Sequence, residues 1–394
     1  MSGKRTVGDA PVRGRRVLVR VDFNVPQLAN GQVADDRRIT EAMPTIEHLR
    51  AHGAKTVLMT HLGRPDGRRD PKYSLRPVVH RVSALLGQPV GLAEDIVGYQ
   101  AIEAVARMKP GDVLMLENLR FHPGEEANDP AFAGQLARLG DLFVEEAFGS
   151  VHRAHASTVG VPRHLPAFAG FLLDREVREL SRIRDQPTPP YIAIVGGAKV
   201  RDKLPLLASF LGRAQTLLIG GALAFPFLAA RGARLGGTPV EEGLEAAVAE
   251  FFAEAERLHT EVLLPVDLIA EDPVRRTVAT VPVGSVPEGL LARDVGPETA
   301  RRFADAIAGS KTVFWNGPLG LAEDPRFAEG TRSVLAALAR APGIHVAAGG
   351  DSARIARDLG VYGEFSFIST GGGAALEFVE GESLPGLAVL PDAN

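Results

Sequence analysis

Short apolar runs of strand length alternate with segments whose apolar residues recur every three or four positions along almost the whole chain. This alternation is typical of repeated βα units, in which helices connect parallel strands and pack on the sheet, so the predicted fold class is α/β. One connecting helix is predicted at 44–53, with Pro44 in its first turn and Gly53 at its end. The predicted strands lie at 16–23, 55–61, 112–121 and 141–148 in the first half and at 191–197, 216–221, 262–270, 312–317, 344–350 and 365–370 in the second.

A charged helix followed by prolines marks the boundary between the two halves of the chain. Residues 173–186 place four apolar side chains on one face of a helix, and residues 186–190, QPTPP, form a stiff segment. The length of 394 residues also suggests two domains, since a domain holds roughly 100 to 200 residues. We predict two Rossmann-like lobes with parallel sheets flanked by helices, at 1–170 and 191–378, joined by an interdomain helix and hinge at 171–190.

Composition excludes several classes of protein. With 45% hydrophobic and 23% charged residues the chain is expected to fold, and its net charge of −4 does not indicate a nucleic-acid or membrane-surface binder. The lack of cysteine excludes disulfides, thiolate metal sites and thiol nucleophiles. The uncharged stretch 216–230 is too short for a membrane span and contains Pro226, so strand, turn and helix explain it better. From the charge and the lack of a span we expect neither nucleic-acid nor membrane partners. Because the first 20 residues lack the apolar core of a signal peptide, we expect a cytoplasmic protein.

Charge and histidine are distributed unevenly between the two halves. The first 170 residues hold 22 Lys and Arg against 19 Asp and Glu, a net charge of +3, and the rest hold 22 against 29, a net charge of −7. Eight of the ten histidines also lie in the first 170 residues. This asymmetry favours an anion site in the first lobe, with a chance distribution of surface charge as the alternative.

Cationic and polar residues follow the predicted strands of the first lobe. In an open parallel sheet, ligands bind beyond the carboxyl ends of the strands. The residues there are Asp22 and Asn24 after the first strand, His61 and Arg64 after the second, Arg120 after the third and Arg153 after the fourth, with Arg38 in the first crossover. Arginine presents a planar fork that matches phosphate and carboxylate oxygens, so the repeated set predicts a small, highly anionic ligand. For any one arginine alone, a solvated surface charge is the alternative.

Two other pairs of polar residues have a structural interpretation. His152 and His155 have the spacing of a metal-binding pair, but no carboxylate cluster accompanies them, so we interpret them as hydrogen-bonded structural histidines. The neighbours Glu125 and Glu126 point in different directions, which favours a loop or helix-start role over an acid/base pair.

Glycine-rich turns follow the strands of the second lobe. Five such turns, at 196–204, 219–225, 315–320, 347–352 and 369–376, place small residues between a strand and a helix, where backbone N–H groups can approach phosphate oxygens. Neither GxxxxGK[ST] nor GxGxxG occurs, which excludes the P-loop and the common dinucleotide fingerprint.

Lysine and aspartate complete the candidate chemistry of the second lobe. The chain holds 37 arginines and only seven lysines, yet Lys199 and Lys203 stand one helical turn apart beside a glycine turn. A compact point charge is therefore favoured at this position. Asp351 follows Gly349 and Gly350, where a Mg²⁺ ligand and a helix N-cap are equally good interpretations.

The motifs that contain these residues resemble the phosphoglycerate kinase family, in family order. They are RVDFNVP (20–26), HLGRP (61–65), ENLRFHPGEE (117–126), HRAHAS (152–157), GGAKVRDKL (196–204), DVGPET (294–299), WNGPLG (315–320), GGDS (349–352) and STGGGA (369–374). With LPG at 384–386, the resemblance covers essentially the whole chain.

The resemblance implies a two-lobed glycolytic kinase that transfers phosphate reversibly, with Mg²⁺, between ATP and the carboxylate of 3-phosphoglycerate. The first lobe would bind 3-phosphoglycerate, the second would bind the nucleotide, and a C-terminal segment at about 379–394 would pack back on the first lobe. Closure about the hinge would then bring the ligands together. We expect a monomer. A non-catalytic homologue that binds nucleotide or phosphoglycerate is the alternative, although such a chain would be expected to lose its reactive lysines first.

The resemblance also assigns site residues. The implied substrate-binding residues are Asp22, Phe23, Asn24, Arg38, His61, Leu62, Gly63, Arg64, Arg120 and Arg153. The implied catalytic residues are Arg38, Lys199, Gly372 and Gly373. The implied nucleotide-binding residues are Lys199, Lys203, Asn316, Glu323, Gly349, Gly350, Asp351 and Ser352. Asp351 would be the protein ligand of the Mg²⁺ in MgATP or MgADP, and Glu323 would hold the ribose hydroxyls.

Four positions depart from the family pattern. Glu146 belongs to a Glu-Glu pair where the family usually has Asn-Asp, and Arg293 falls in a normally small or apolar stretch. Ala222 lies in a turn that usually ends in methionine, and Ala348 replaces a glycine. The changes at 222, 293 and 348 predict an altered base pocket and nucleotide affinity in an enzyme that keeps its phosphate-handling residues.

Overall fold

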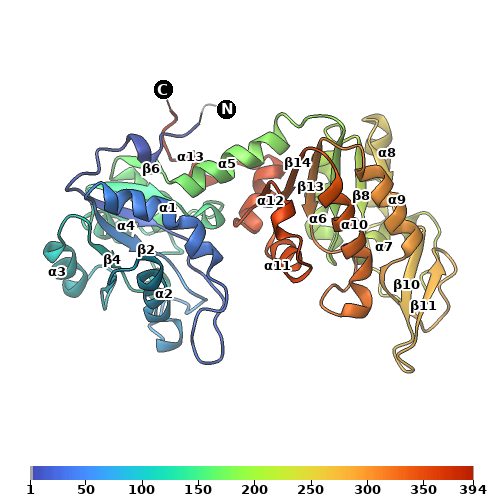
Figure 1. Ribbon diagram of the computed structural model, residues 1–394, viewed down its shortest axis with the longest axis horizontal. Coiled ribbons are helices and arrows are strands. Elements are labelled where there is room, and N and C mark those ends of the chain that lie inside the picture. The colour runs from blue at the N-terminus through green and yellow to red at the C-terminus, as the bar shows by residue number, and fades with distance from the viewer. Residues whose placement is uncertain (1–2, 394) are drawn as a thin grey trace. The chain divides into compact units, whose positions relative to one another are not determined.

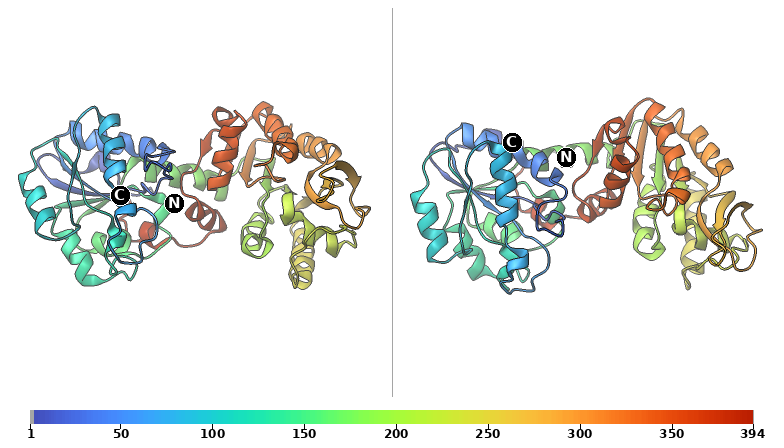
Figure 2. Two further views of the ribbon diagram at one scale, coloured as in Figure 1. Left: turned by 90° about the horizontal axis from the view of Figure 1, so that it is seen from below. Right: turned by 60° about the horizontal axis from the view of Figure 1, so that its bottom comes forward.

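Two compact units make up the protein, which was analysed as a computed structural model that describes residues 3–393 (Figure 1). The first contains the chain up to Arg178 together with the segment from Ser383 onward, and the second is Glu179–Glu382. The division falls within α5 (Phe171–Arg184). Each unit contains a six-stranded parallel sheet, and Figure 2 shows its helices flanking that sheet. The predicted α/β fold with two lobes built on parallel sheets is confirmed.

The sheet of the first unit has the order β3-β4-β2-β1-β5-β6. Its inner strands read as continuous apolar runs because both faces are covered, and Val17, Val19, Leu58 and Val144 are fully buried. The strands are β1 (Arg16–Arg20), β2 (Lys55–Met59), β3 (Gly91–Leu92), β4 (Val113–Met115), β5 (Leu142–Glu145) and β6 (Ala167–Ala169). The sequence predicted four of these strands and missed β3 and β6, which are too short to form a recognisable pattern.

The helices of the first unit include one that the sequence placed too late. They are α1 (Arg37–Ala51), α2 (Arg76–Leu86), α3 (Tyr99–Arg107), α4 (Pro130–Ala137), the first part of α5 and α13 (Pro385–Ala388). The prediction that α1 begins at Pro44 is wrong, because this proline lies inside the helix. Burial of Ile39, Met43, Ile46 and Leu49 at helical spacing stabilises the helix on both sides of Pro44. Arg38, which the sequence placed in the first crossover, therefore lies in the first turn of α1.

The parallel sheet of the second unit has the order β15-β14-β13-β7-β8-β9. Its strands are β7 (Tyr191–Val195), β8 (Thr216–Ile219), β9 (Glu261–Leu263), β13 (Thr312–Asn316), β14 (Ile344–Ala347) and β15 (Phe367–Ile368). The helices of this unit, besides the end of α5, are α6 (Val200–Phe210), α7 (Phe225–Ala230), α8 (Glu245–Arg257), α9 (Pro297–Ile307), α10 (Glu329–Arg340), α11 (Gly350–Asp358) and α12 (Gly373–Glu380). The fully buried Trp315 lies in the core cluster of this unit.

A small antiparallel sheet in the second unit corrects the expectation of parallel sheets alone. In it β10 (Asp267–Glu271) pairs with β11 (Val278–Pro282) and with β12 (Leu291–Val295). The single strand predicted at 262–270 is in fact two strands, β9 and β10, which belong to different sheets. Pro265 lies between them and lacks the N–H that a continuous strand would need. β11 gave no apolar signal because most of its side chains are exposed.

The C-terminal segment completes the first unit by pairing with the N-terminal segment. Lys4 forms an antiparallel bridge with Asp392, and the Arg5 N–H donates to the carbonyl of Pro391 at 3.1 Å. The N–H of Gly386 donates to the carbonyl of Val151 at 2.8 Å. The two terminal segments therefore lie side by side (Figure 1).

The apolar stretch 216–230 forms β8, a short 3₁₀ turn and α7, as predicted. None of the helices within residues 3–393 is long and apolar enough to cross a membrane.

We expect Gly196→Ala to destabilise the second unit. A Cβ at this position would lie 2.0 Å from the carbonyl oxygen of Pro318, which is backbone and cannot rotate away. Overpacking of this kind costs about 1–3 kcal/mol, which for a unit of this size lowers the thermal unfolding midpoint by several degrees. Gly309→Ala is the matched control, since its Cβ would meet no atom within 4 Å. Equal midpoints for the two variants, measured by calorimetry, would contradict the close backbone packing at Gly196.

Candidate functional site

Two strand-end loops of the first unit and the start of α1 are bound to one another through predicted site residues. Nη1 of Arg38, on α1, donates to Oδ2 of Asp22 at 2.9 Å and to the carbonyl of Asn24 at 3.4 Å. Oδ1 of Asn24 accepts from the Gly63 N–H at 3.0 Å. Phe23 is fully buried, and its N–H donates to the Thr60 hydroxyl at 2.9 Å. The loops after β1 and β2 and the start of α1 therefore form one hydrogen-bonded surface.

Arg120 extends this surface from the turn that follows β4. Its Nη1 donates to the carbonyl of Gly63 at 2.8 Å, and its Nη2 lies 3.3 Å from Oε1 of Glu126. Asn118 accepts from the Leu62 N–H at 3.2 Å through the same Oδ1 that accepts from the Arg120 N–H at 3.1 Å. The turn at Gly63 requires glycine, since φ is +64° and a Cβ would lie 2.3 Å from the ring of Tyr73.

Positive charge gathers around His61 at this edge of the sheet. Burial lowers the pKa of His61 well below its usual value, and the charges of Arg20, Arg38 and Arg120 lower it further. Burial, followed by the charges of Arg20, Arg120 and Arg153, lowers the pKa of His155 to about 4. Both imidazoles are therefore neutral near pH 7. Arg64 and Arg153, which are exposed, contribute further positive charge that acts on Arg120.

Arg20 belongs to this cluster and was missed from the sequence, where it read as a strand residue. Its side chain is 1% exposed, and Nε donates to the Ser157 hydroxyl at 2.9 Å. Nη2 lies 3.2 Å from Nδ1 of His61. Because a guanidinium only donates, Nδ1 must accept, and the proton of the neutral imidazole is held on Nε2. Its place at the head of the RVDFNVP motif was the signal that could have identified it.

The motif histidines and Glu125 have structural partners. His155 forms a capping box with Thr158, and Nε of Arg153 donates to Nε2 of His152 at 3.0 Å. Glu125 is buried and accepts from the Ser157 hydroxyl at 2.6 Å, which links it to the same serine as Arg20. Within residues 3–393 there is no group of three or more His, Asp or Glu side chains that could hold a metal ion.

The second unit has a cavity of about 350 Å³ at the carboxyl ends of its strands. The glycine turns after β7, β8 and β13 pack backbone against backbone at its edge, where a Cβ on Gly221 would lie 2.9 Å from the carbonyl of Gly197. The predicted site residues Glu323 and Asp351 line it, as do Ala222 and Arg293 from the unusual positions. Ala348 is not among the residues that line it. The remaining predicted nucleotide-binding and catalytic residues of this unit lie outside its lining.

Lys203 and the glycine turn before α11 are fixed by Asn316 at the end of β13. Nζ of Lys203 donates to Oδ1 of Asn316, whose Nδ2 donates to the carbonyl of Ala348 at 2.7 Å. Ser352 accepts from the Gly317 N–H at 2.9 Å. Burial lowers the pKa of Lys203, while the charges of Asp351 and Glu380 act in the opposite direction. Lys203 is therefore bonded directly to Asn316, and Ser352 is bonded to the backbone of the next residue, Gly317.

Lys199, Asp351 and the last glycine turn lie at helix N-termini. Lys199 is exposed at the N-cap of α6, and Gly372 occupies the N-cap of α12 directly before Gly373. The Asp351 side chain, in the first turn of α11, is 79% exposed and 3.8 Å from Nη2 of Arg354. The same Nη2 lies 3.5 Å from Oε1 of Glu323. Arg354 thus connects the carboxylate assigned to Mg²⁺ with the one assigned to ribose.

Glu146, which departs from the family pattern, is buried against the start of α5. Its Oε2 accepts from the N–H groups of Leu172 and Leu173 at 3.1 and 3.2 Å. Burial raises its pKa to about 8, against the opposing effect of these hydrogen bonds. The neighbouring Glu145 is also fully buried, and burial raises its pKa well above the usual value. The longer side chain at 146 therefore caps this helix.

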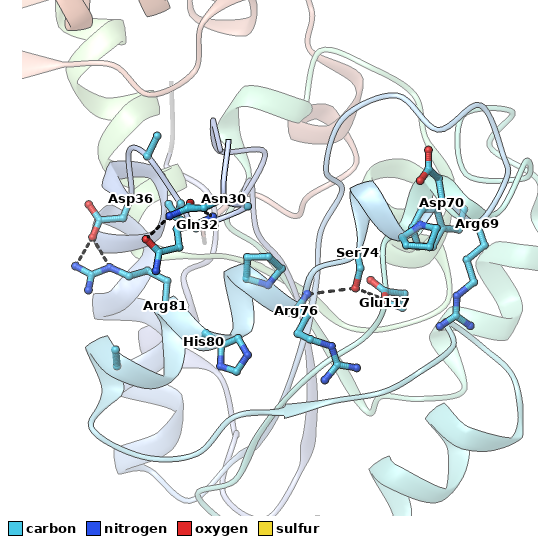
Figure 3. Close-up of a pocket in the computed structure, with 17 residues that line it drawn as sticks. Asn30, Gln32, Asp36, Arg69, Asp70, Ser74, Arg76, His80, Arg81 and Glu117 are labelled. Carbon is cyan, nitrogen blue, oxygen red and sulfur yellow. Dashed lines mark hydrogen bonds and ion pairs between the residues drawn. The ribbon is translucent and has the colours of Figure 1, made fainter. Parts of the chain in front are cut away.

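A second cavity in the first unit, of about 1010 Å³, contains none of the predicted site residues (Figure 3). It is bordered by the loop at 30–36 and by α2. Glu117 accepts from the Ser74 hydroxyl at 2.9 Å and from the Leu75 N–H at 2.8 Å, which fixes the start of α2 to the end of β4. The motif residue Glu117 therefore has a structural role here.

Two α/β units, one with a cationic strand edge and one with a glycine-lined cavity, define a protein that handles two anionic ligands, as phosphotransferases do. The family model of phosphoglycerate kinase matches residues 7–382, and the chain belongs to this family. It is therefore a phosphotransferase that acts on phosphoglycerate and ATP, and a non-catalytic homologue is not favoured.

Similar proteins match over nearly the full length. Phosphoglycerate kinase of Moorella thermoacetica is 47% identical over 391 residues, 99% of each chain. That of Pelotomaculum thermopropionicum is 48% identical over 391 residues, again 99% of each chain. The solved structure of phosphoglycerate kinase from Coxiella burnetii has a TM-score of 0.89 at 34% identity and covers 98% of both chains.

We expect Glu146→Gln to flatten the pH dependence of stability. The folded carboxyl has a pKa of about 8 and the unfolded one an ordinary value near 4.5, so between these values the folded state retains a proton that the unfolded state has released. Stability therefore falls as pH rises through this window, by up to about 1.4 kcal/mol per pH unit from this group. Gln retains the acceptor oxygen and removes the titration.

Urea unfolding of the two proteins at pH values from 5 to 8 measures this difference. Glu47→Gln is the control, because Glu47 is exposed on α1 and should leave the slope unchanged. A wild-type slope retained in Glu146→Gln would show that Glu146 ionises normally.

Proposed function

We propose that the domain at 1–170 binds 3-phosphoglycerate through the cationic edge around His61. The observation that carries this proposal is the gathering of five arginines, from strand ends and from the start of α1, around a neutral histidine. Such charges repel one another, so an anionic ligand that neutralises them is strongly favoured. The arginines are Arg20, Arg38, Arg64, Arg120 and Arg153. The loops that bear Asp22, Phe23, Asn24, Leu62 and Gly63 shape the site around the ligand.

We propose that the domain at 191–378 binds the nucleotide in the cavity lined by Glu323 and Asp351. Glu323 accepts hydrogen bonds from the ribose hydroxyls at one side of this cavity. Lys203, Asn316 and Ser352 are bound to one another or to the neighbouring turns, and they hold the backbone at Gly349 and Gly350 in place for the phosphates. Lys199 and the N–H groups of Gly372 and Gly373 lie at helix starts, where positive partial charge favours phosphate.

The reaction proposed needs no general base. A carboxylate oxygen of 3-phosphoglycerate attacks the γ-phosphorus of ATP, a new O–P bond forms, and the bond to the β-phosphate oxygen breaks to release ADP. The nucleophile is already ionised near neutral pH, unlike a hydroxyl. Catalysis then consists of positioning the two ligands and stabilising charge on the transferring phosphoryl oxygens, which Arg38, Lys199 and the glycine N–H groups supply.

We propose Asp351 as the protein ligand of Mg²⁺. The exposed carboxylate fits a hard cation, and the lack of a wider acidic cluster in residues 3–393 fits a metal that arrives on the nucleotide, since such Mg²⁺ takes one or two protein carboxylates. When bound, Mg²⁺ neutralises charge on the phosphate oxygens. The Asp351 side chain lines the cavity and lies 3.8 Å from Nη2 of Arg354.

We also propose that the protein acts as a cytoplasmic monomer and that the residues at 171–190 permit closure. Sedimentation velocity and cell fractionation test the first two proposals. Closure would lower the radius of gyration in solution scattering when both ligands are added, and an unchanged radius would count against it.

Purified protein should transfer phosphate from MgATP to 3-phosphoglycerate at roughly 1 to 10³ turnovers per second. The rate is measured by coupling consumption of the acyl phosphate product to oxidation of a nicotinamide cofactor. Lys199→Ala should lower kcat on the order of 10²-fold or more, as expected for loss of one transition-state donor. Lys311→Ala is the matched control, because Lys311 is exposed next to the opposite end of β13. Nearly full turnover in Lys199→Ala would refute the role of this lysine.

Asp351→Asn should raise the Mg²⁺ concentration that gives half-maximal turnover by about tenfold, since the amide retains the shape but loses the charge. A magnesium titration at fixed nucleotide concentration measures this shift. Asp305→Asn, on α9 and 65% exposed, removes a carboxylate that forms an ion pair with Arg301, and it is the control that should leave the titration unchanged. Coincident curves for the three proteins would contradict the proposed metal role.

A further inference from the structure

Arg293 is the extra residue of a β-bulge at the wall of the nucleotide cavity. In the pairing of β10 with β12, Ile269 lies opposite Asp294 and Ala270 lies opposite Ala292, so Arg293 has no partner on the facing strand. Bulges redirect the side chain of the inserted residue and occur preferentially next to functional sites. Arg293 lines the cavity of about 350 Å³ that Glu323 and Asp351 also line.

The backbone and one edge of the Arg293 guanidinium are fixed. Its carbonyl accepts from the Leu321 N–H at 2.9 Å, and its Nε donates to Oε2 of Glu271 at 3.2 Å. The Glu271 side chain is 2% exposed and also binds Arg326 at 2.9 Å and Arg276 at 3.4 Å. Hydrogen bonds and charge from these arginines lower the pKa of Glu271, although burial opposes the shift. The carboxylate is therefore a firm anchor for Arg293.

The other edge of the guanidinium is open. Among the described residues, no hydrogen bond is made by Nη1 or Nη2 of Arg293, whose side chain is 28% exposed. Because the guanidinium is planar and its Nε is bonded to Glu271, the N–H groups of Nη1 and Nη2 form a pair of nearly parallel donors whose direction is restricted. Phe225 and Leu321 line the same cavity and supply apolar surface for a planar ring.

We propose that Arg293 is a specificity-determining residue that reads the nucleotide base and favours 6-oxopurines, such as guanine and hypoxanthine, over adenine. This inference rests on the proposed nucleotide role of the cavity. A 6-oxopurine places two acceptors, O6 and N7, side by side, and a pair of arginine donors matches them. Adenine places a donor, its N6 amino group, beside N7, so one arginine donor meets a donor instead of an acceptor.

Nucleotide binding to the full chain tests the proposal. Calorimetry with MgADP, MgGDP and MgIDP gives the ratio of Kd for ADP to Kd for GDP in the wild type, in Arg293→Met and in Arg276→Met. The ratio should fall about tenfold in Arg293→Met, within the range expected for a bidentate arginine contact to a 6-oxopurine. IDP should follow GDP, because it shares O6 and N7 and lacks only the 2-amino group.

Arg276→Met is the matched control because it removes a different arginine from the same Glu271 and does not alter the cavity lining. Its ratio should equal that of the wild type. The proposal would be overturned by a Kd ratio that is unchanged in Arg293→Met, or by a ratio that falls equally in Arg293→Met and Arg276→Met. Failure of the wild type to bind either ADP or GDP would also overturn it. Turnover of the wild type with ATP and 3-phosphoglycerate tests the proposed function independently of base recognition. If the wild type turns over and the Kd ratio is unchanged in Arg293→Met, base recognition by Arg293 is refuted and the proposed function is not. Selective binding without turnover refutes only the catalytic assignment.

Discussion

In a parallel sheet the carboxyl ends of all strands lie at the same edge, and both candidate sites, the cationic edge of the first unit and the cavity of the second, depend on this constraint. Each strand must return through a crossover helix, so strand ends and helix starts meet along the same line. In the first unit this line brings Asp22, Asn24, His61 and Arg120 together from loops that are far apart in sequence. In the second unit the same geometry places glycine turns and helix N-termini beside one cavity.

The two units use this edge in different ways. The first unit concentrates charge and restrains it: Asp22 orients Arg38, the carbonyl of Gly63 holds Arg120, and Arg20 sets the proton position of His61. The second unit relies on close approach of backbone segments, since a Cβ on Gly196, Gly220 or Gly221 would lie within 3 Å of a neighbouring atom. At the start of α12, by contrast, a Cβ on Gly372 or Gly373 would meet no atom within 4 Å. Clustered arginine side chains suit a small ligand with two anionic ends. Glycine turns that allow the backbone to approach a ligand closely suit a chain of phosphates.

The strength of a pattern decided what the sequence could predict. Long apolar runs identified the strands of the two parallel sheets except the short β3 and β6. The motifs after those strands predicted Arg120, Lys203 and Asp351 as site residues, and these assignments remain predictions. Prediction failed where tertiary contacts override a local signal, as at Pro44, where burial on both sides continues α1 through a residue that usually begins a helix. It failed again at β11, whose exposed side chains form no apolar run, and at β12, where Arg293 and Asp294 interrupt the apolar residues. The bulge at Arg293 depends on pairing with β10, which no local pattern encodes.

The pairing of Lys4 with Asp392 makes the first unit discontinuous and gives protein synthesis a role in folding. The first unit emerges from the ribosome before the second, yet its final segment begins only at Ser383. At about 5 to 20 residues per second, the first unit must wait roughly 10 to 40 seconds for that segment after Arg178 has been made. The second unit, Glu179–Glu382, is continuous and reaches its full length first, so the half of the protein that is translated later is the first to be complete.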